Sequence, residues 1–197
     1  TDEIVRHAKV GFELARKRRK NLVSVDKANV MESGVLWRKV VTDVSREYPD
    51  VSLCHLYADN CAYQLAKKPT QFDVILTDNL FGDLLSDLAG ALVGSLGMLP
   101  SASLSSLKND PAINAPGIYE PVHGTAPDIA GQNIVNPLGM ILSVGMMLEY
   151  GFDDSDAALK LRTSVDSALS KGVRTLDIGG KASTSEMTDA VIQAWKS

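Results

Sequence analysis

The chain has 197 residues, 45% of them hydrophobic and 22% charged, which is the balance of an ordinary globular protein. This composition excludes a disordered tail, a collagen-like repeat and a small disulfide-stabilised scaffold. The net charge of -4 argues against a dedicated nucleic-acid-binding protein, and the longest apolar stretch, residues 140–148, is too short to cross a bilayer.

Helix-like and strand-like patterns alternate through the first half of the chain. Apolar residues three and four positions apart predict helices, and alternating apolar residues predict strands between them. The helices are expected at residues 4–15, 35–48, 58–68 and 80–98, and the strands at residues 22–25, 51–57 and 72–77. Strands that alternate with helices of this length indicate an α/β fold.

The second half of the chain has a different composition, and we place a domain boundary near residue 95. Residues 100–117 are rich in Ser, Asn, Pro and Ala and predict a loop, and Gly and Pro interrupt residues 121–137. Helical patterns follow at residues 138–150, 155–170 and 185–195. The predicted domains are therefore residues 1–95 and residues 96–197.

An acidic pair stands out in the helix expected at residues 80–98. Asp83 and Asp87 are four residues apart, so a helix places both carboxylates on one face. Their apolar neighbours predict a largely buried helix, and buried carboxylates need a partner. Because no Lys, Arg or His occurs at residues 69–107, that partner is either distant in sequence or a hard cation such as Mg²⁺ or Mn²⁺. The alternative is a solvated acidic stripe on a surface helix.

Five consecutive bases occupy residues 16–20, at the end of the first predicted helix. A run of this kind could bind nucleic acid or serve as a targeting patch. We favour a solvated helix end, because positive charges there interact favourably with the helix dipole.

Five motifs in a fixed order resemble the β-decarboxylating dehydrogenases, the family of the isocitrate and isopropylmalate enzymes. They are SVDKANV at residues 24–30, YADN at 57–60, NLFGDLLSD at 79–87, LPSASL at 99–104 and EPVHGTAPDIAG at 120–131. The resemblance covers nearly the whole chain and is strongest to the isopropylmalate branch. It implies an α/β fold of this family's type, with two α/β domains of which the chain is a part. A Rossmann fold is not expected, because no G-x-G-x-x-G sequence occurs.

The resemblance implies oxidative decarboxylation of 3-isopropylmalate to 4-methyl-2-oxopentanoate in leucine biosynthesis, with NAD and Mg²⁺ or Mn²⁺. It implies that Asp59, Asp83 and Asp87 are the metal ligands, and that Asp59 also binds the substrate. Asp59 is similar to the family residue that crosses a dimer interface to complete the partner's site. Lys27 aligns with the family's catalytic lysine, which acts as a base toward the substrate hydroxyl. The alternative for Lys27 is a surface lysine paired with Asp26.

The resemblance also implies a set of cofactor contacts. It places Asn29 at the nicotinamide end and Val30 against the alkyl group of the substrate, although core packing is an alternative for Val30. Residues 123–136 are similar to the adenosine-binding loop, so the implied contacts there are His123, Gly124, Thr125, Ala126, Asp128, Ile129 and Asn136. Asp128 can accept hydrogen bonds from a ribose 2′-hydroxyl and would repel a 2′-phosphate, which favours NAD over NADP. Asp128 could also cap a following helix.

The partners implied by the resemblance are a small-molecule substrate and a second copy of the chain, with no nucleic acid and no membrane. The helices expected at residues 35–48 and 80–98 carry more apolar surface than one small layer can hide, which agrees with a homodimer with shared active sites. The first domain would then hold the substrate, the metal and the dimer interface. The second domain would be the C-terminal part of the nucleotide-binding domain.

The chain also departs from the family pattern. Thr1 falls inside a helical pattern, so we expect a preceding portion that holds the substrate-binding arginines and the enol-protonating tyrosine. The chain is similar to roughly the C-terminal half of the enzyme, and we expect the isolated chain to be inactive. Residues 105–117 look longer than the family requires. The alternatives are an isocitrate or tartrate dehydrogenase relative, and a non-catalytic metal-binding or dimerisation fragment.

The cellular location is inferred from the cysteines. Cys54 and Cys61 lack the spacing of a zinc site or a redox motif. A reducing compartment is the simpler interpretation, so we expect a cytoplasmic protein. An organelle is the alternative if a transit peptide lies in the preceding portion.

Overall fold

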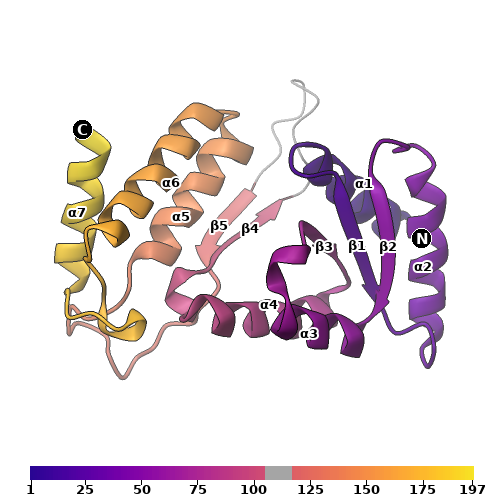
Figure 1. Cartoon of the computed structure of the whole chain (residues 1–197), viewed down its shortest axis with the longest axis horizontal. Coiled ribbons are helices and arrows are strands. Elements are labelled where there is room, and N and C mark those ends of the chain that lie inside the picture. Colours follow the sequence, from indigo (N-terminus) through magenta and orange to yellow (C-terminus); the bar gives the residue numbers. More distant parts are fainter. Residues whose placement is uncertain (105–116) are drawn as a thin grey trace. The chain divides into compact units, whose positions relative to one another are not determined.

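The computed structural model describes residues 1–104 and 117–197, so most of the predicted loop at residues 100–117 lies outside the described residues. The chain divides into two compact units, Thr1–Leu92 and Val93–Ser197 (Figure 1). The division falls close to the boundary predicted near residue 95. The functions assigned to the two predicted domains stay predictions.

The first unit is built on a parallel sheet in the order β2-β1-β3, in which Leu22 of β1 pairs with Leu53 of β2 and Val74 of β3 (Figure 1). Parallel neighbours need a long crossover connection, and helices provide it here. The elements are α1 (Asp2–Arg16), β1 (Asn21–Asp26), α2 (Glu32–Ser45), β2 (Ser52–Tyr57), α3 (Ala58–Lys67), a 3₁₀ turn (Pro69–Gln71), β3 (Val74–Leu76) and α4 (Asn79–Val93). This order confirms the predicted α/β alternation.

The sheet of the first unit is buried on both faces. Leu22 packs with Trp37 in a cluster formed with α1 and α2, whereas Val25 packs with Leu85 in a cluster formed with α3 and α4. Side chains of a strand alternate between faces, so a strand covered on both sides is apolar at most positions. Ser24 and Asp26 are the buried polar residues of β1, and the hydroxyl of Ser24 accepts a hydrogen bond from the indole of Trp37 at 3.1 Å.

Two helices of the first unit end earlier than predicted. The helix α2 covers Glu32–Ser45 instead of residues 35–48, and α4 ends at Val93 instead of residue 98. Gly94 adopts a φ of +107°, a conformation that a side chain disfavours, and this residue stops α4. A separate 3₁₀ turn follows at Leu96–Met98, where the Ser95 hydroxyl accepts a hydrogen bond from the backbone of Gly97.

The second unit combines an antiparallel strand pair with helices (Figure 1). The core is formed by Leu138, Val165, Ala168, Met187 and Val191. The elements are β4 (Pro100–Leu104), β5 (Gly117–Pro121), α5 (Leu138–Met146), a π-helical turn (Met147–Gly151), α6 (Ser155–Ser170), a 3₁₀ turn (Leu176–Ile178) and α7 (Thr184–Lys196). No helix in the described parts of the chain has the length and apolar character needed to cross a membrane.

The prediction of a loop over residues 100–117 is wrong where the chain is described, because Pro100–Leu104 is a strand that pairs with β5. Small polar residues disfavour strands by composition, but the bonds between strands come from the backbone. The strand also rests on α5, where the backbone of Ser101 donates to the hydroxyl of Ser143 at 3.4 Å. Gly139 allows this close packing, since an added Cβ would lie 3.2 Å from the carbonyl oxygen of Leu99.

Candidate functional site

Lys27 and Asp59 meet at one edge of the sheet in the first unit. Asp26 at the end of β1 is in register with Tyr57 at the end of β2, so the residues that follow both strands share an edge. There the ammonium of Lys27 forms an ion pair with the carboxylate of Asp59. The hydrogen bond from Lys27 holds the pKa of Asp59 below its usual value. The structure thus brings together a predicted base and a predicted metal ligand.

Asp26 does not pair with Lys27. Its carboxylate is only 1% exposed and accepts two hydrogen bonds from the guanidinium of Arg38, at 2.9 and 3.0 Å. It also accepts one from the backbone N–H of Ala28 at 2.9 Å. The alternative of a surface Lys27–Asp26 pair is therefore wrong, because Arg38 and Ala28 already occupy the Asp26 carboxylate. Sequence reasoning missed Arg38, and no local spacing signals a pair that joins a strand end to a helix.

Asn29 and Val30 lie on a tight turn that follows β1. The backbone N–H groups of Val30 and Met31 donate to the carbonyl of Lys27 at 3.0 and 2.9 Å. This turn leaves Asn29 exposed and Val30 71% exposed. Core packing, the alternative for Val30, is therefore wrong. Both side chains are accessible to a bound molecule on the same turn as Lys27.

Asp83 and Asp87 lie one turn apart on α4, as the spacing predicts, but the helix is not largely buried. Both aspartates are exposed, and Leu84 between them is 61% exposed. The expectation of buried carboxylates is wrong because only the opposite face of α4 is covered: Leu85 packs with Cys61 and Leu65 of α3. The alternative of an exposed acidic stripe agrees with these positions.

The metal ligands implied by the family do not assemble within the described residues. Across residues 1–104 and 117–197, no group of three or more His, Cys, Asp or Glu side chains is close enough to hold a metal ion. The chemistry of the donors nevertheless fits Mg²⁺ or Mn²⁺, since carboxylate oxygens are the ligands these ions prefer. Asp83 and Asp87 provide such oxygens from one exposed helix face. Their role as metal ligands stays a prediction, because two carboxylates do not by themselves complete a site for these ions.

The predicted adenosine-binding loop belongs to the second unit and has neither helix nor strand between β5 and α5. His123, Ala126 and Ile129 are partly buried, whereas Gly124, Thr125 and Asp128 are exposed. Ala126 has a positive φ of 40°, and the backbone of Ile129 donates to its carbonyl at 3.1 Å. The alternative that Asp128 caps a following helix is wrong, because turns follow it and the next helix begins at Leu138.

Asn136 differs from the rest of this loop because it is only 4% exposed. Its side-chain N–H donates to Asp177 at 3.0 Å, and its side-chain oxygen accepts from the backbone of Leu138 at 3.0 Å. Hydrogen bonds from Ser95, Thr175 and Asn136 keep the pKa of Asp177 below its usual value against the opposing effect of burial. The side-chain amide of Asn136 therefore ties the end of the loop to Asp177 and to the start of α5. A cofactor contact through this amide would have to replace its hydrogen bonds with Asp177 and Leu138.

Sequence reasoning missed Asn133, which fastens the same loop to the start of α7. Its side-chain oxygen accepts from the backbone and hydroxyl of Ser185 at 3.1 and 3.0 Å, and its carbonyl accepts from Thr184 at 2.9 Å. Asn133 has a φ of 56°, in the left-handed region that asparagine tolerates better than most residues. An Asn two residues after Gly131 in a turn-rich segment was the available signal.

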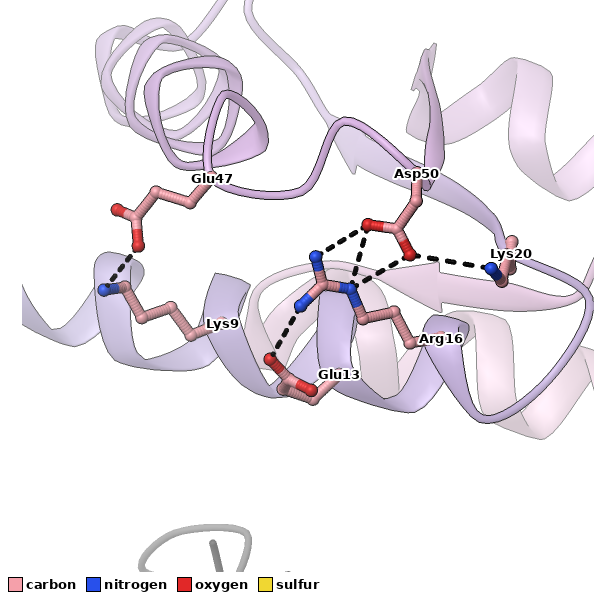
Figure 2. Close-up of polar contacts among 6 residues, drawn as sticks. All are labelled: Lys9, Glu13, Arg16, Lys20, Glu47 and Asp50. Carbon is pink, nitrogen blue, oxygen red and sulfur yellow. Dashed lines mark hydrogen bonds and ion pairs between the residues drawn. The ribbon is translucent and has the colours of Figure 1, made fainter.

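The basic run at residues 16–20 is tied to acidic side chains. Arg16 contacts Asp50 and Glu13, and Lys20 also reaches Asp50 at 3.7 Å (Figure 2). Arg18 and Arg19 pair with Asp73, whose side chain is 1% exposed. Residues 17–20 are exposed, which agrees with the preferred solvated helix end, and ion pairs to other elements neutralise part of their charge.

Comparisons with known proteins agree with the motifs. The family model described as isocitrate/isopropylmalate dehydrogenase matches residues 1–191. A 3-isopropylmalate dehydrogenase from Rhodospirillum rubrum is 58% identical over 98% of this chain and 52% of its own length. One from Zymomonas mobilis is 55% identical over 98% of this chain and 53% of its own length. The crystal structure of isocitrate dehydrogenase from Methylococcus capsulatus superposes with a TM-score of 0.88 at 33% identity, over 100% of this chain and 57% of that one.

The chain spans about half the length of the curated relatives it matches. The α/β architecture predicted from the sequence is confirmed by the superposition, which likewise covers little more than half of the solved enzyme. All five motifs that suggested the relationship lie within the matched residues 1–191.

Proposed function

Because this chain belongs to the isocitrate/isopropylmalate dehydrogenase family, we propose that the protein containing it converts 3-isopropylmalate to 4-methyl-2-oxopentanoate in leucine biosynthesis. The observation that carries this proposal is the 55–58% identity, over 98% of the chain, to proteins named 3-isopropylmalate dehydrogenase. The reaction oxidises the substrate hydroxyl with NAD and then releases CO₂. A cytoplasmic location stays a prediction.

Lys27 is the proposed base of the oxidation step. Its ammonium lies beside Asp59, at the end of the sheet where β1 and β2 finish. Its side chain is 25% exposed, so most of it packs against the protein while part stays accessible to a substrate. In its neutral form, Lys27 accepts the proton of the substrate hydroxyl as the hydride leaves the same carbon for the nicotinamide. Asn29 and Val30 share its turn, which favours contacts to the nicotinamide and to the alkyl group of the substrate.

Asp83 and Asp87 are proposed to bind Mg²⁺ or Mn²⁺ together with Asp59 from a second copy of the chain. When bound, the ion would polarise the oxygen of the substrate and stabilise the negative charge left by CO₂ release. Two observations support a shared site: no described set of residues completes it, and Asp59 lies exposed at a sheet edge beside Lys27. The three carboxylates would hold the ion, and the ion would in turn help to orient the substrate.

A homodimer is part of this proposal. The exposed apolar side chains Val35 and Leu36 of α2 and Leu80 and Leu84 of α4 support it, because a second copy would remove them from water. Light scattering of the native-length protein at micromolar concentration should give the mass of a dimer. A monomer would contradict the shared site.

NAD is the proposed cofactor, with the loop at residues 123–136 as its adenosine site. The exposed carboxylate of Asp128 can accept from a ribose 2′-hydroxyl and repels a 2′-phosphate. Gly124 leaves room for close approach, since an added Cβ would meet nothing within 4 Å. His123, Thr125, Ala126 and Ile129 complete the proposed contacts, and Asn136 supports the loop from beneath.

An enzyme assay tests the proposal. The native-length protein is incubated with NAD, Mn²⁺ and 3-isopropylmalate, and NADH formation is measured, with isocitrate and tartrate in parallel. Preferential turnover of isocitrate or tartrate would contradict the substrate and favour those relatives. The 197-residue chain by itself is predicted to be inactive, and robust turnover by it would refute that prediction.

A further inference from the structure

Arg38 contacts the ends of both strands that carry the Lys27–Asp59 pair. Its Nε and Nη2 atoms donate to the two oxygens of Asp26 at 2.9 and 3.0 Å. Its guanidinium also lies over the ring of Tyr57, with Cζ 4.9 Å from the centroid. Asp26 directly precedes Lys27, and Tyr57 lies two residues before Asp59. The Arg38 side chain therefore contacts a residue close in sequence to each member of the pair: Asp26 beside Lys27, and Tyr57 near Asp59.

Asp26 links Arg38 to the backbone on either side of Lys27. The same oxygen that accepts from Arg38 also accepts from the N–H of Ala28, at 2.9 Å. The residues on both sides of Lys27 are thus tied to one carboxylate that is 1% exposed. A two-point arginine–carboxylate contact fixes direction as well as distance, and water competes little for a buried acceptor.

The helix α2, which carries Arg38, packs closely against the turn that contains Lys27 and Ala28. A Cβ added to Gly34 would lie 2.7 Å from the nitrogen of Ala28 and 2.9 Å from the carbonyl carbon of Lys27, so the absent side chain permits the close approach. One residue before Arg38, Trp37 donates to Ser24 of β1 at 3.1 Å. The helix α2 is therefore held at a defined distance from the end of β1.

We infer that Arg38, acting through Asp26 and Tyr57, is a positioning residue that sets the relative placement of Lys27 and Asp59. It contacts neither the substrate nor the cofactor in this scheme. The expected effect on catalysis rests on the proposed function. The contacts of Arg38 do not depend on that function. A displacement of about 1 Å of a reacting group can cost on the order of 10²-fold in rate.

The test is Arg38→Lys in the native-length protein. Lysine keeps the positive charge but cannot donate in a planar fork or stack on a ring in the same way. We expect faster amide hydrogen exchange at residues 27–31 and 58–60. We also expect kcat for 3-isopropylmalate to fall by roughly 10–100-fold while KM changes by less than about threefold, because positioning affects the transition state more than binding.

Arg16→Lys is the matched control. Two nitrogens of Arg16 also donate to one aspartate, Asp50, at 3.0 and 2.6 Å (Figure 2). Its guanidinium likewise lies over a tyrosine ring, with Cζ 4.4 Å from the centroid of Tyr48. It sits beside the amino ends of β1 and β2, opposite the edge that carries Lys27. Its loss should raise exchange around residues 48–52 and leave kcat within about twofold of the parent.

Two results would overturn the inference: unchanged exchange at residues 27–31 in Arg38→Lys, or equal losses of kcat in both variants, which would indicate a general effect on stability. If Arg38→Lys does not fold, Asp26→Asn weakens the same contact while keeping an acceptor for Ala28, and the same readouts apply. If the parent protein does not turn over 3-isopropylmalate, the proposed function fails, and the exchange measurement still decides the positioning role.

Discussion

Lys27 and Asp59 are 32 residues apart in the sequence and form an ion pair where two neighbouring parallel strands end. The pair exists because β1 and β2 run in the same direction and finish in register, so the residue after one strand lies near those after the other. Exposed ion pairs contribute little to stability, so a role in function explains this pair better than a role in stabilising the fold.

Lys27→Met should reduce kcat by about 10²–10⁴-fold in the native-length protein, because no other group on this turn replaces the base. Steady-state kinetics with 3-isopropylmalate measures this loss. Lys9→Met is a suitable control, since Lys9 pairs with Glu47 on the surface at 2.9 Å (Figure 2). Retention of normal kcat by Lys27→Met would assign the base to another residue.

Asp83→Asn should weaken Mn²⁺ binding by at least about tenfold, since even groups that only support a metal ligand typically contribute 10–100-fold. Calorimetric titration of the native-length protein with Mn²⁺ measures the effect, and Asp87→Asn should behave similarly. Asp166→Asn on α6 provides an exposed helical aspartate as a control. Unchanged affinity in both α4 variants would return Asp83 and Asp87 to an acidic surface stripe.

Asn133→Ala should lower the free energy of unfolding by about 1–2 kcal/mol, because alanine tolerates the left-handed conformation less well than asparagine and cannot accept the hydrogen bonds from Ser185. It should also weaken NAD binding, because the side-chain bonds from Ser185, which fasten the loop, are lost. Asn133→Gly relieves the backbone strain but not the lost side-chain bonds, so its NAD affinity should stay reduced. Urea unfolding and NAD titration separate the two effects, and full NAD affinity in Asn133→Gly would exclude an anchoring role.

His55 should make the protein less stable in mild acid. Burial, followed by the charge of Arg38, lowers the pKa of His55 below its usual 6.5, although Asp26 acts in the opposite direction. The unfolded chain therefore takes up this proton at a higher pH than the folded chain does. The contribution of neutral His55 is fully present above the unfolded pKa and is lost as pH falls below about 6.5.

The hydrogen bonds around His55 agree with a neutral ring. The hydroxyl of Thr42 donates to the carbonyl of Arg38 at 2.7 Å, so it accepts from Nε2 of His55 at 3.1 Å. Within the described residues, Nδ1 of His55 is buried without a hydrogen-bond partner. His55→Gln should therefore flatten the fall in unfolding free energy between pH 7 and pH 5, measured by urea titration at each pH. An unchanged slope would show that other groups cause it.

The sequence by itself determined the alternation of helices and strands, and its ordered motifs identified the family. Hydrophobic periodicity succeeds here because each strand and helix of the first unit buries a defined face, as Leu22 and Val25 do on opposite sides of the sheet. The motif around Lys27 lies directly after β1, in agreement with the strand predicted before it. These features are local, so neighbouring residues are sufficient to specify them.

Only the tertiary structure decided which groups pair and which faces are covered. Lys27 pairs with Asp59 because the register of β1 and β2 brings their ends together. Asp26 pairs with Arg38 because α2 packs against the end of β1, and no pattern in the sequence relates these positions. Asp83 and Asp87 are exposed because the covered face of α4 is the one that packs on α3. The strand Pro100–Leu104 forms from backbone bonds to β5, which composition does not record. Pairing and burial depend on segments distant in sequence, and these are set by the fold as a whole.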